Sequence, residues 1–412
     1  MAEDINFEQK EKKLMEYVEK FSFPRLAGSE GEREAVKLTI NTFKDIGYEE
    51  NQIEKLNFEF STFYSEELIK IIGFMNILLI FTLLLIKYIY PYSAIITGII
   101  FLLLFLSMLK VLKHPELKGF WEKHFGTFIS ATNVIIKIPP NNIKNGELSR
   151  NIVVSAHLDS KSQTFKTFWR VVFFSIWQFG IIIFIILFVF FIIDLYFYLF
   201  RSILLSLEIS TIITASLIIF SILMIILTKT RNLSLGSLDN ASGMALIFML
   251  SSYFRDKPLK NSNLWLCQFS AEEIGTMGSR VFLDTFEEQL VRSDTFQINF
   301  DMVSCQNHKN EVEYIKSYGI FPKKEVSSIL SRHIREIAKE KDITIRGHTL
   351  LSGAHTDSVP FHLVDLKTID FSTPLAAKYS HSKEDTPKRV NPKVLLDTFI
   401  IIQNLVLRLD KN

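Results

Sequence analysis

The stretch NIVVSAHLDS, residues 151–160, decides the fold class of this chain. Its first half is a short run rich in β-branched residues, which is typical of a buried strand. Its second half places His157 and Asp159 at the end of that run. In an open α/β sheet, the side chains that bind ligands lie beyond the carboxyl ends of the strands. The stretch therefore predicts a strand that carries a functional site at its end.

The segments around this strand alternate between strand patterns and helix patterns. Short apolar or β-branched runs bounded by turn residues predict strands, and apolar residues at helical spacing predict helices. The predicted strands are 133–138, 151–157, 264–271 and 296–303, and the predicted helices are 27–47, 240–254, 324–340 and 391–407. Ser29 and Gly47 mark the two ends of the first helix. The alternation indicates an α/β domain with a mixed, mostly parallel sheet flanked by helices.

Four long apolar runs interrupt this polar chain. They cover 71–90, 93–109, 171–193 and 209–227. Each is close to the ~20 residues that a helix needs to cross the hydrocarbon core of a bilayer. The runs are apolar on all sides, which disfavours an amphipathic surface helix, and Pro91 fits a tight turn between the first two. The sequence predicts four transmembrane helices in two hairpins, with deeply buried core helices as the alternative.

The two hairpins divide the chain. We expect the hairpins at 69–110 and 168–228, the second with a loop at 194–208, and one discontinuous domain made of 1–68, 111–167 and 229–412. Basic residues flank the runs on the domain side, at Lys70, Lys110, Lys113, Lys118, Lys161, Lys166, Arg170, Lys229 and Arg231, against Lys87 and Arg201 on the other side. Basic loops stay in the cytoplasm, and the polar start of the chain lacks the pattern of a signal peptide. We therefore expect a multi-pass membrane protein whose domain is cytoplasmic.

The composition excludes other classes of protein. The net charge is +2, from 46 basic and 44 acidic residues. No basic strip alternates with aromatic residues, so we expect no nucleic-acid partner. Cys267 and Cys305 are isolated and too few for a disulfide framework, so we interpret both as small buried apolar residues.

A set of nitrogen and oxygen ligands is spread along the polar parts of the chain. The set comprises His157 in AHLDS, Asp239 in SLDNASG, Glu272 and Glu273 in SAEEIG, Asp301 in NFDM and His381 in SHSKEDTP. A two-metal hydrolytic site needs imidazole and carboxylate ligands, one carboxylate that bridges the metals, and one left free as a base. Taken alone, Asp239 reads as a helix cap and His381 as an ordinary loop histidine. Together the residues predict a metal centre.

Local spacing suggests how three acids in this region act. Asp159 lies two residues after His157, so on an extended backbone it can accept the second ring N–H of that histidine and fix its tautomer. The adjacent side chains of Glu272 and Glu273 diverge, so that one can bind metal while the other faces water as a base. The alternative for this pair is an exposed acidic patch.

The motifs, taken in order along the chain, resemble those of the M28 peptidases, a zinc-dependent family of aminopeptidases, carboxypeptidases and glutaminyl cyclases. The resemblance extends from PRLAGSEGE at 24–32 to the last predicted helix. It implies an eight-stranded mixed sheet and two zinc ions, with Glu272 as the general base. It also implies the ligand sets Asp239, Glu273, His381 and His157, Asp239, Asp301. The pair Thr356 and Asp357 is similar to a family loop near the substrate pocket, and we assign it no catalytic role.

The chain departs from the family pattern in two places. About 80 residues separate His157 from Asp239, where relatives usually have a short loop, and the second hairpin accounts for the excess. Ser380 precedes His381 where some aminopeptidases carry a tyrosine, and Tyr379 lies one place earlier, so the oxyanion-stabilising residue is open. His355 is a spare imidazole nearby.

These features predict a function. We expect a membrane-anchored di-zinc metallopeptidase, an aminopeptidase acting on short or membrane-proximal peptides. The second hairpin is inserted in the loop that joins the ligands His157 and Asp239, so the active site is expected to open close to the membrane surface. The expected partners are a peptide substrate and a lipid bilayer, and the sequence indicates no oligomeric state. The alternatives are an acyltransferase similar to glutaminyl cyclases and a non-catalytic receptor or scaffold on a peptidase fold.

Overall fold

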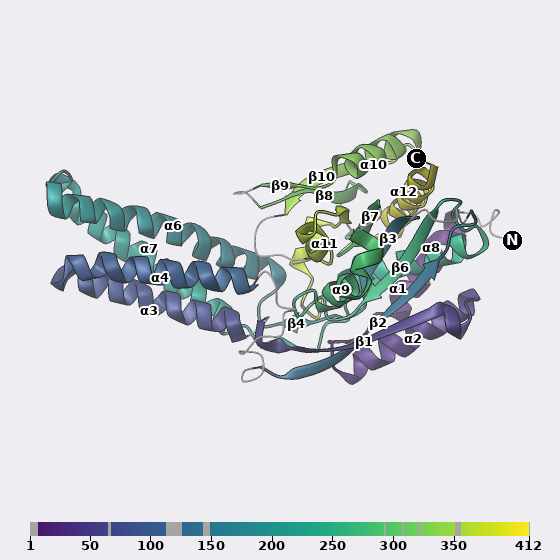
Figure 1. Ribbon diagram of the computed structural model, residues 1–412, viewed down its shortest axis with the longest axis horizontal. Coiled ribbons are helices and arrows are strands. Elements are labelled where there is room, and N and C mark those ends of the chain that lie inside the picture. The colour runs from purple at the N-terminus through teal and green to yellow at the C-terminus, as the bar shows by residue number, and fades with distance from the viewer. Residues whose placement is uncertain are drawn as a thin grey trace. The chain divides into compact units, whose positions relative to one another are not determined.

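The computed structural model describes residues 7–64, 67–112, 126–142, 149–291, 294–306, 309–319, 323–350 and 356–411. The chain divides into two compact units (Figure 1). The first, called here the sheet unit, comprises Met1–Phe60, Phe128–Thr167 and Thr230–Asn412. The second, the helical unit, comprises Ser61–Thr127 and Phe168–Lys229.

The sheet unit is built on one mixed sheet. Its strands are β1 (Ile53–Ser61), β2 (Phe128–Ile138), β3 (Arg150–His157), β6 (Ser262–Phe269), β7 (Thr295–Phe300), β8 (Val312–Tyr318), β9 (Lys324–Glu325), β10 (Ile345–Leu350) and β11 (Lys367–Phe371). The strand order is β1–β2–β6–β3–β7–β11–β8–β10, and β9 pairs with β8. β6, β3, β7 and β11 are parallel neighbours, whereas β2 on β6 and β11 on β8 are antiparallel. The mixed, mostly parallel sheet is confirmed, and it has the two-residue β9 in addition to the eight strands implied.

Helices cover both faces of this sheet. They are α1 (Phe7–Lys20), α2 (Glu30–Ile46), α8 (Ser242–Asp256), α9 (Met277–Val291), α10 (Ser328–Glu340), α11 (Val359–Leu363) and α12 (Pro392–Lys411). Alternate residues of β3 enter different cores, because successive side chains of a strand point to opposite faces. Val154 packs in the core with α1, α8 and α12, and Val153 packs in the core with Phe282 of α9 and Phe361 of α11. Cys267 and Cys305 are buried and free, as interpreted.

Local signals set the ends of two helices. The Ser29 side chain accepts a hydrogen bond from the N–H of Glu32, and Gly47 ends α2 in the left-handed conformation with φ of 110°, as predicted. The predicted helix 324–340 is wrong at its start. Ser327 caps α10 by accepting from the N–H of Leu330, so the preceding residues are free to pair with β8 as β9.

The helical unit contains α3 (Glu67–Ile89), α4 (Pro91–Leu112), α6 (Thr167–Phe197, whose first residue belongs to the sheet unit) and α7 (Leu204–Ile226). Within the described residues, three helices are long and apolar enough to cross a membrane: Glu67–Leu85, Thr167–Phe197 and Arg201–Ile226. Three of the four predicted spans are thus found; in the remaining run, 93–109, the apolar helical stretch found among the described residues is Tyr92–Leu104, which is shorter than a span. The predicted loop 194–208 is mostly helical. The Asp194 carboxylate accepts the N–H of Phe200 at 2.7 Å, just beyond the end of α6.

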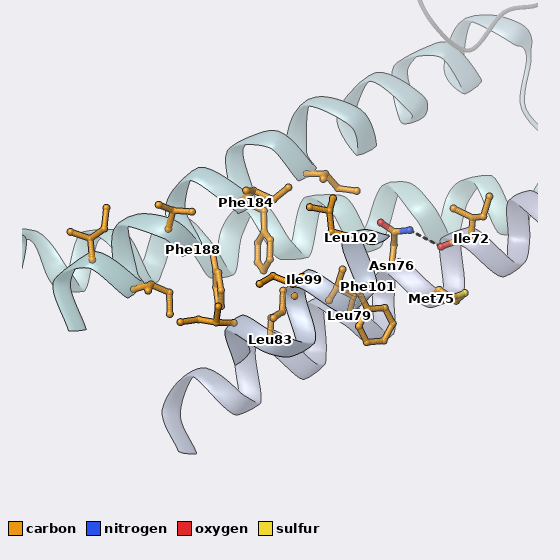
Figure 2. Close-up of a pocket in the computed structure, with 17 residues that line it drawn as sticks. Ile72, Met75, Asn76, Leu79, Leu83, Ile99, Phe101, Leu102, Phe184 and Phe188 are labelled. Atoms are coloured by element: carbon orange, nitrogen blue, oxygen red, sulfur yellow. Dashed lines mark hydrogen bonds between the residues drawn. The ribbon is translucent and has the colours of Figure 1, made fainter. Parts of the chain in front are cut away.

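Side chains of α3, α4 and α6 line a partly open cavity of about 360 Å³ within the helical unit (Figure 2). Asn76 is the one polar side chain among its described lining residues, and its amide donates to the carbonyl of Ile72 at 2.7 Å. The rest of the lining is aliphatic or aromatic, as Leu83, Phe184 and Phe188 illustrate. Burying an unpaired polar group in such surroundings is costly, so this cavity does not suit a metal ion or a peptide backbone.

One histidine of the sheet unit makes the stability of the fold sensitive to acid. His348 on β10 is partly buried, and neither ring nitrogen has a hydrogen-bond partner among the described residues. Burial, with Arg346 and Lys316 nearby, lowers the pKa of His348 from 6.5 to about 4. Between these values the unfolded chain binds a proton that the folded chain does not, so stability falls as the pH falls through this window.

We expect the His348→Gln variant to lose less unfolding free energy than the wild type when the pH is lowered from 7.5 to 4.5. The expected difference is about 1–2 kcal/mol, because a partly exposed group keeps some hydration. Urea unfolding of both proteins at the two pH values measures it. An equal loss in the two proteins would show that His348 is not the group responsible.

Candidate metal centre

Three adjacent parallel strands bring the candidate ligands to one edge of the sheet. His157 is the last residue of β3, Asp301 follows the last residue of β7, and Glu272 and Glu273 lie just beyond the end of β6. Because β6, β3 and β7 are parallel neighbours, their carboxyl ends meet at the same edge. The sheet therefore brings His157 to acids that follow it by more than 100 positions in the sequence.

The five predicted ligands converge in two overlapping groups. His157, Asp239 and Asp301 form one group, and Asp239, Glu273 and His381 form the other; in each group one ligand atom per residue lies within 4.8 Å of the others. Nε2 of His157 is 3.1 Å from Oδ1 of Asp239 and 3.6 Å from Oδ1 of Asp301. Nε2 of His381 is 3.3 Å from Oδ2 of Asp239 and 3.0 Å from Oε2 of Glu273. Asp239 thus turns one carboxylate oxygen toward each histidine, which is the arrangement of a bridging ligand.

The position of Asp239 depends on an acid that sequence reasoning missed. The carboxylate of Asp385 accepts the N–H of Leu238 at 2.6 Å and the N–H of Asp239 at 3.2 Å. Burial, followed by the charge of Asp239, raises the pKa of Asp385 to about 7. Asp385 lies in the quoted motif SHSKEDTP. The available signal was an acid four residues after the candidate ligand His381. The local sequence does not indicate which backbone N–H groups that acid accepts.

Asp159 connects the end of β3 to the glutamate pair. Nδ1 of His157 lies 3.1 Å from the backbone carbonyl of Asp159 and 3.5 Å from its carboxylate. The ring N–H is therefore held by the carbonyl more closely than by the side chain. The Asp159 carboxylate accepts the backbone N–H groups of Glu272 and Glu273, each at 3.2 Å. It thereby orients the loop that carries both glutamates.

The two adjacent glutamates have opposite surroundings. Burial would raise the pKa of Glu273, but His381 and Lys161 together lower it to about 2, and Nζ of Lys161 lies 2.9 Å from its Oε2. The carboxylate of Glu272 makes no hydrogen bond or ion pair with the described residues, and burial raises the pKa of Glu272 well above its usual value. When the surroundings of two neighbouring acids shift their pKa values in opposite directions, the two acids can have different roles. Here Glu273 suits a metal ligand and Glu272 suits an acid–base group.

A buried arginine joins the loops that lead to the site. The Arg25 side chain is fully buried and donates to backbone carbonyls from three distant parts of the chain. Its acceptors are the carbonyls of Phe21, Phe23, Leu158, Leu235 and Gly236, at 2.6–3.0 Å. Burial lowers the pKa of Arg25 to about 10. The guanidinium thus fixes the loop after His157 against the loop before Asp239.

The donor set fits zinc. The five side chains are buried, and unpaired buried carboxylates are costly unless a cation or hydrogen bonds compensate them. Nε2 of His157 is buried and makes no hydrogen bond with the described residues, although two carboxylate oxygens face it. Imidazole and carboxylate ligands in groups of three suit zinc with an open position. The two groups could therefore each hold one ion.

Other residues singled out in the sequence belong to neither of these groups. Asp357 is fully buried, and burial raises the pKa of Asp357 to about 7. Ser380 is buried, and the ring of Tyr379 lies 4.2 Å from the guanidinium of Arg389. His355, Lys113 and Lys118 lie outside the described residues.

Comparison with known proteins gives a family and a fold. Residues 223–406 match the family model of Peptidase family M28. Aminopeptidase YwaD of Bacillus subtilis (strain 168) is 24% identical over 165 residues, which is 39% of this chain and 34% of that protein. This chain therefore spans about a third of the length of that relative.

Two solved aminopeptidases are similar to nearly the whole chain. The aminopeptidase from Aneurinibacillus sp. strain AM-1 has a TM-score of 0.55 at 14% identity, over 97% of this chain and 93% of that one. BSAP, a zinc aminopeptidase from Bacillus subtilis, has a TM-score of 0.55 at 13% identity, over 97% and 94%. A glutaminyl cyclase from an Acidobacteriales bacterium has a TM-score of 0.52 at 12% identity, over 100% and 97%. At these identities the likeness shows a shared fold.

Proposed function

Since this chain carries the domain of peptidase family M28, we propose that it is a membrane-anchored zinc metallopeptidase, an aminopeptidase that acts on short or membrane-proximal peptides. One observation carries the proposal: two buried ligand groups share Asp239, and Glu272, whose carboxylate is unpaired, immediately precedes the ligand Glu273 in the sequence. A binding module would have no need for a buried, uncompensated acid beside two metal positions.

Two zinc ions are proposed to bind the two groups. Asp239, Glu273 and His381 would hold one ion, and His157, Asp239 and Asp301 the other. When bound, zinc polarises a carbonyl oxygen and lowers the pKa of water. The protein's part is to hold the five ligands in place, through Asp385 behind Asp239 and through the carbonyl of Asp159 behind His157.

Glu272 is the proposed general base. Its carboxylate makes no hydrogen bond or ion pair with the described residues, and burial raises its pKa, so it can take a proton from a water molecule. Its raised pKa lets it keep that proton until it donates it to the departing amine. Asp159 contributes by fixing the backbone of Glu272 and Glu273, which keeps one carboxylate on the metal side and leaves the other free.

Membrane anchoring is supported by the three long apolar helices. We further propose that the sheet unit lies on the cytoplasmic side, because Lys161, Lys166 and Arg231 flank α6 and α7 at the ends that join this unit. In sealed right-side-out vesicles, added protease should leave the sheet unit intact and should cleave it only after the vesicles are opened. Cleavage in the sealed vesicles would reverse the orientation.

Activity is tested with a panel of peptides on the purified full-length protein. Peptides with a free N-terminus, a blocked N-terminus and a blocked C-terminus are compared with and without a chelator. An aminopeptidase cleaves only those with a free N-terminus and stops when zinc is removed. A peptide that begins with glutamine and is cyclised rather than cleaved, together with a single bound zinc, would identify a cyclase instead. No turnover of any peptide by zinc-loaded protein would indicate a receptor or scaffold.

A further inference from the structure

The short segment that leads from β3 into α6 encloses one half of the metal centre. This segment, 161–167, is called here the connector. Nζ of Lys161 lies 2.9 Å from Oε2 of Glu273. The N–H of Gln163 donates to the carbonyl of His381 at 2.9 Å. Oγ1 of Thr167 lies 3.0 Å from Nδ1 of His381. These contacts fall on the Glu273–His381 group and not on the group around His157.

His381 needs such support more than an ordinary loop residue. Its backbone has a φ of 60°, in the left-handed region that non-glycine residues rarely adopt. Residues held in this region persist when the surrounding structure over-determines them. The hydrogen bond from Gln163 restrains the backbone, and the contact with Thr167 restrains the ring.

The hydrogen-bond direction follows from the chemistry of the ring. Nε2 of His381 faces Asp239 and Glu273, so a metal ion would bind at this nitrogen and the proton would sit on Nδ1. Nδ1–H then donates to the hydroxyl oxygen of Thr167. The Thr167 O–H is left to donate to Oγ of Ser380, which lies 2.7 Å away. A threonine hydroxyl can donate and accept at once, so this series of hydrogen bonds from His381 through Thr167 to Ser380 uses both roles of the Thr167 hydroxyl.

We propose that Thr167 is a positioning residue, which fixes the imidazole of His381 toward the metal from the first turn of α6. The inference rests on the proposed metal centre. Partners of the second ring nitrogen set the tautomer and orientation of a ligating histidine. Here that partner is the first residue of a 31-residue helix that is long and apolar enough to span a membrane. The other histidine ligand differs, because Nδ1 of His157 is held by Asp159 in the loop that directly follows β3.

Zinc affinity of the full-length protein tests this, measured by competition with a chromogenic chelator. Thr167→Val keeps the shape of the side chain and removes the hydroxyl. We expect it to lower the affinity for one of the two zinc ions by about 10- to 100-fold. Thr167→Ser keeps the hydroxyl and should restore wild-type affinity. Thr228→Val is the matched control, because Thr228 follows the end of α7 and its hydroxyl donates only to the carbonyl of Met224. It should bind both ions like the wild type.

The outcomes separate the inference from the proposed function. Wild-type protein that binds no zinc overturns both. Wild-type protein that binds two ions, with a Thr167→Val variant that binds them equally well, overturns only the role of Thr167. The same holds if Thr167→Ser loses as much affinity as Thr167→Val, since the hydroxyl would then not be the active group. The unfolding midpoint of each variant shows whether a loss is general, and a Thr228→Val loss of equal size would assign the effect to the hairpin as a whole.

Discussion

Replacing Glu272 with glutamine is expected to lower kcat by roughly 10²- to 10⁴-fold, the usual contribution of a general base, without changing the zinc content. The amide has nearly the same shape as the carboxylate but cannot take a proton from water. Glu272 belongs to neither of the two groups found among the described residues, and its side chain makes no hydrogen bond or ion pair with them that the substitution would break. Peptide turnover and zinc content are measured on the same sample.

Glu273→Gln is the matched control for this experiment, because it makes the same chemical change at the adjacent residue. Glu273 lies 3.0 Å from His381 and belongs to a metal group. Its substitution should lower zinc affinity as well as turnover. A Glu272→Gln protein that keeps its activity, or one that loses zinc as Glu273→Gln does, would remove Glu272 from the role of base.

Asp239→Asn is expected to affect both metal positions together. Asp239 belongs to both ligand groups and turns one oxygen toward each histidine. A neutral amide has one oxygen ligand and cannot bridge two cations. We expect the bound zinc to fall from two ions to less than one, and turnover to fall at least as far as in Glu272→Gln. Metal analysis after dialysis against dilute zinc measures the change.

Asp301→Asn is the control for Asp239→Asn, because it removes a ligand of one metal group rather than the ligand that both groups share. Asp301 belongs only to the group with His157, so its substitution should leave the ion at Glu273 and His381 in place. If Asp239→Asn and Asp301→Asn lose the same amount of zinc, Asp239 does not bridge. The unfolding midpoints of both variants show whether the fold is intact.

Strand patterns predicted the sheet and the edge at which the candidate ligands gather. All four predicted strands are present, because runs such as NIVVSAH are buried on both faces and their apolar character is visible in a short window. His157 and Asp301 could be placed because each lies late in such a run. Helix ends were less well predicted: 324–340 missed β9, and the loop 194–208 proved mostly helical, since a single hydrogen bond or cap decides where a helix ends.

The contacts behind the ligands could not be predicted. Asp385 holds the N–H of Asp239 across 146 residues, and Thr167 meets His381 across 214. Contacts of this kind follow from how the loops fold over the sheet and leave no periodic pattern in the sequence. The same holds for Arg25, whose acceptors are backbone carbonyls that any residue could supply.

The position of α6 and α7 in the chain imposes an order on biosynthesis. A chain leaves the ribosome from its N-terminus, so His157 emerges first, the hairpin next, and Asp239, Glu273, Asp301 and His381 last. His157 therefore precedes both apolar helices, and the other four proposed ligands follow them. In the proposed metal centre the ligand set is complete only after the hairpin has been made, so zinc would bind as a late step.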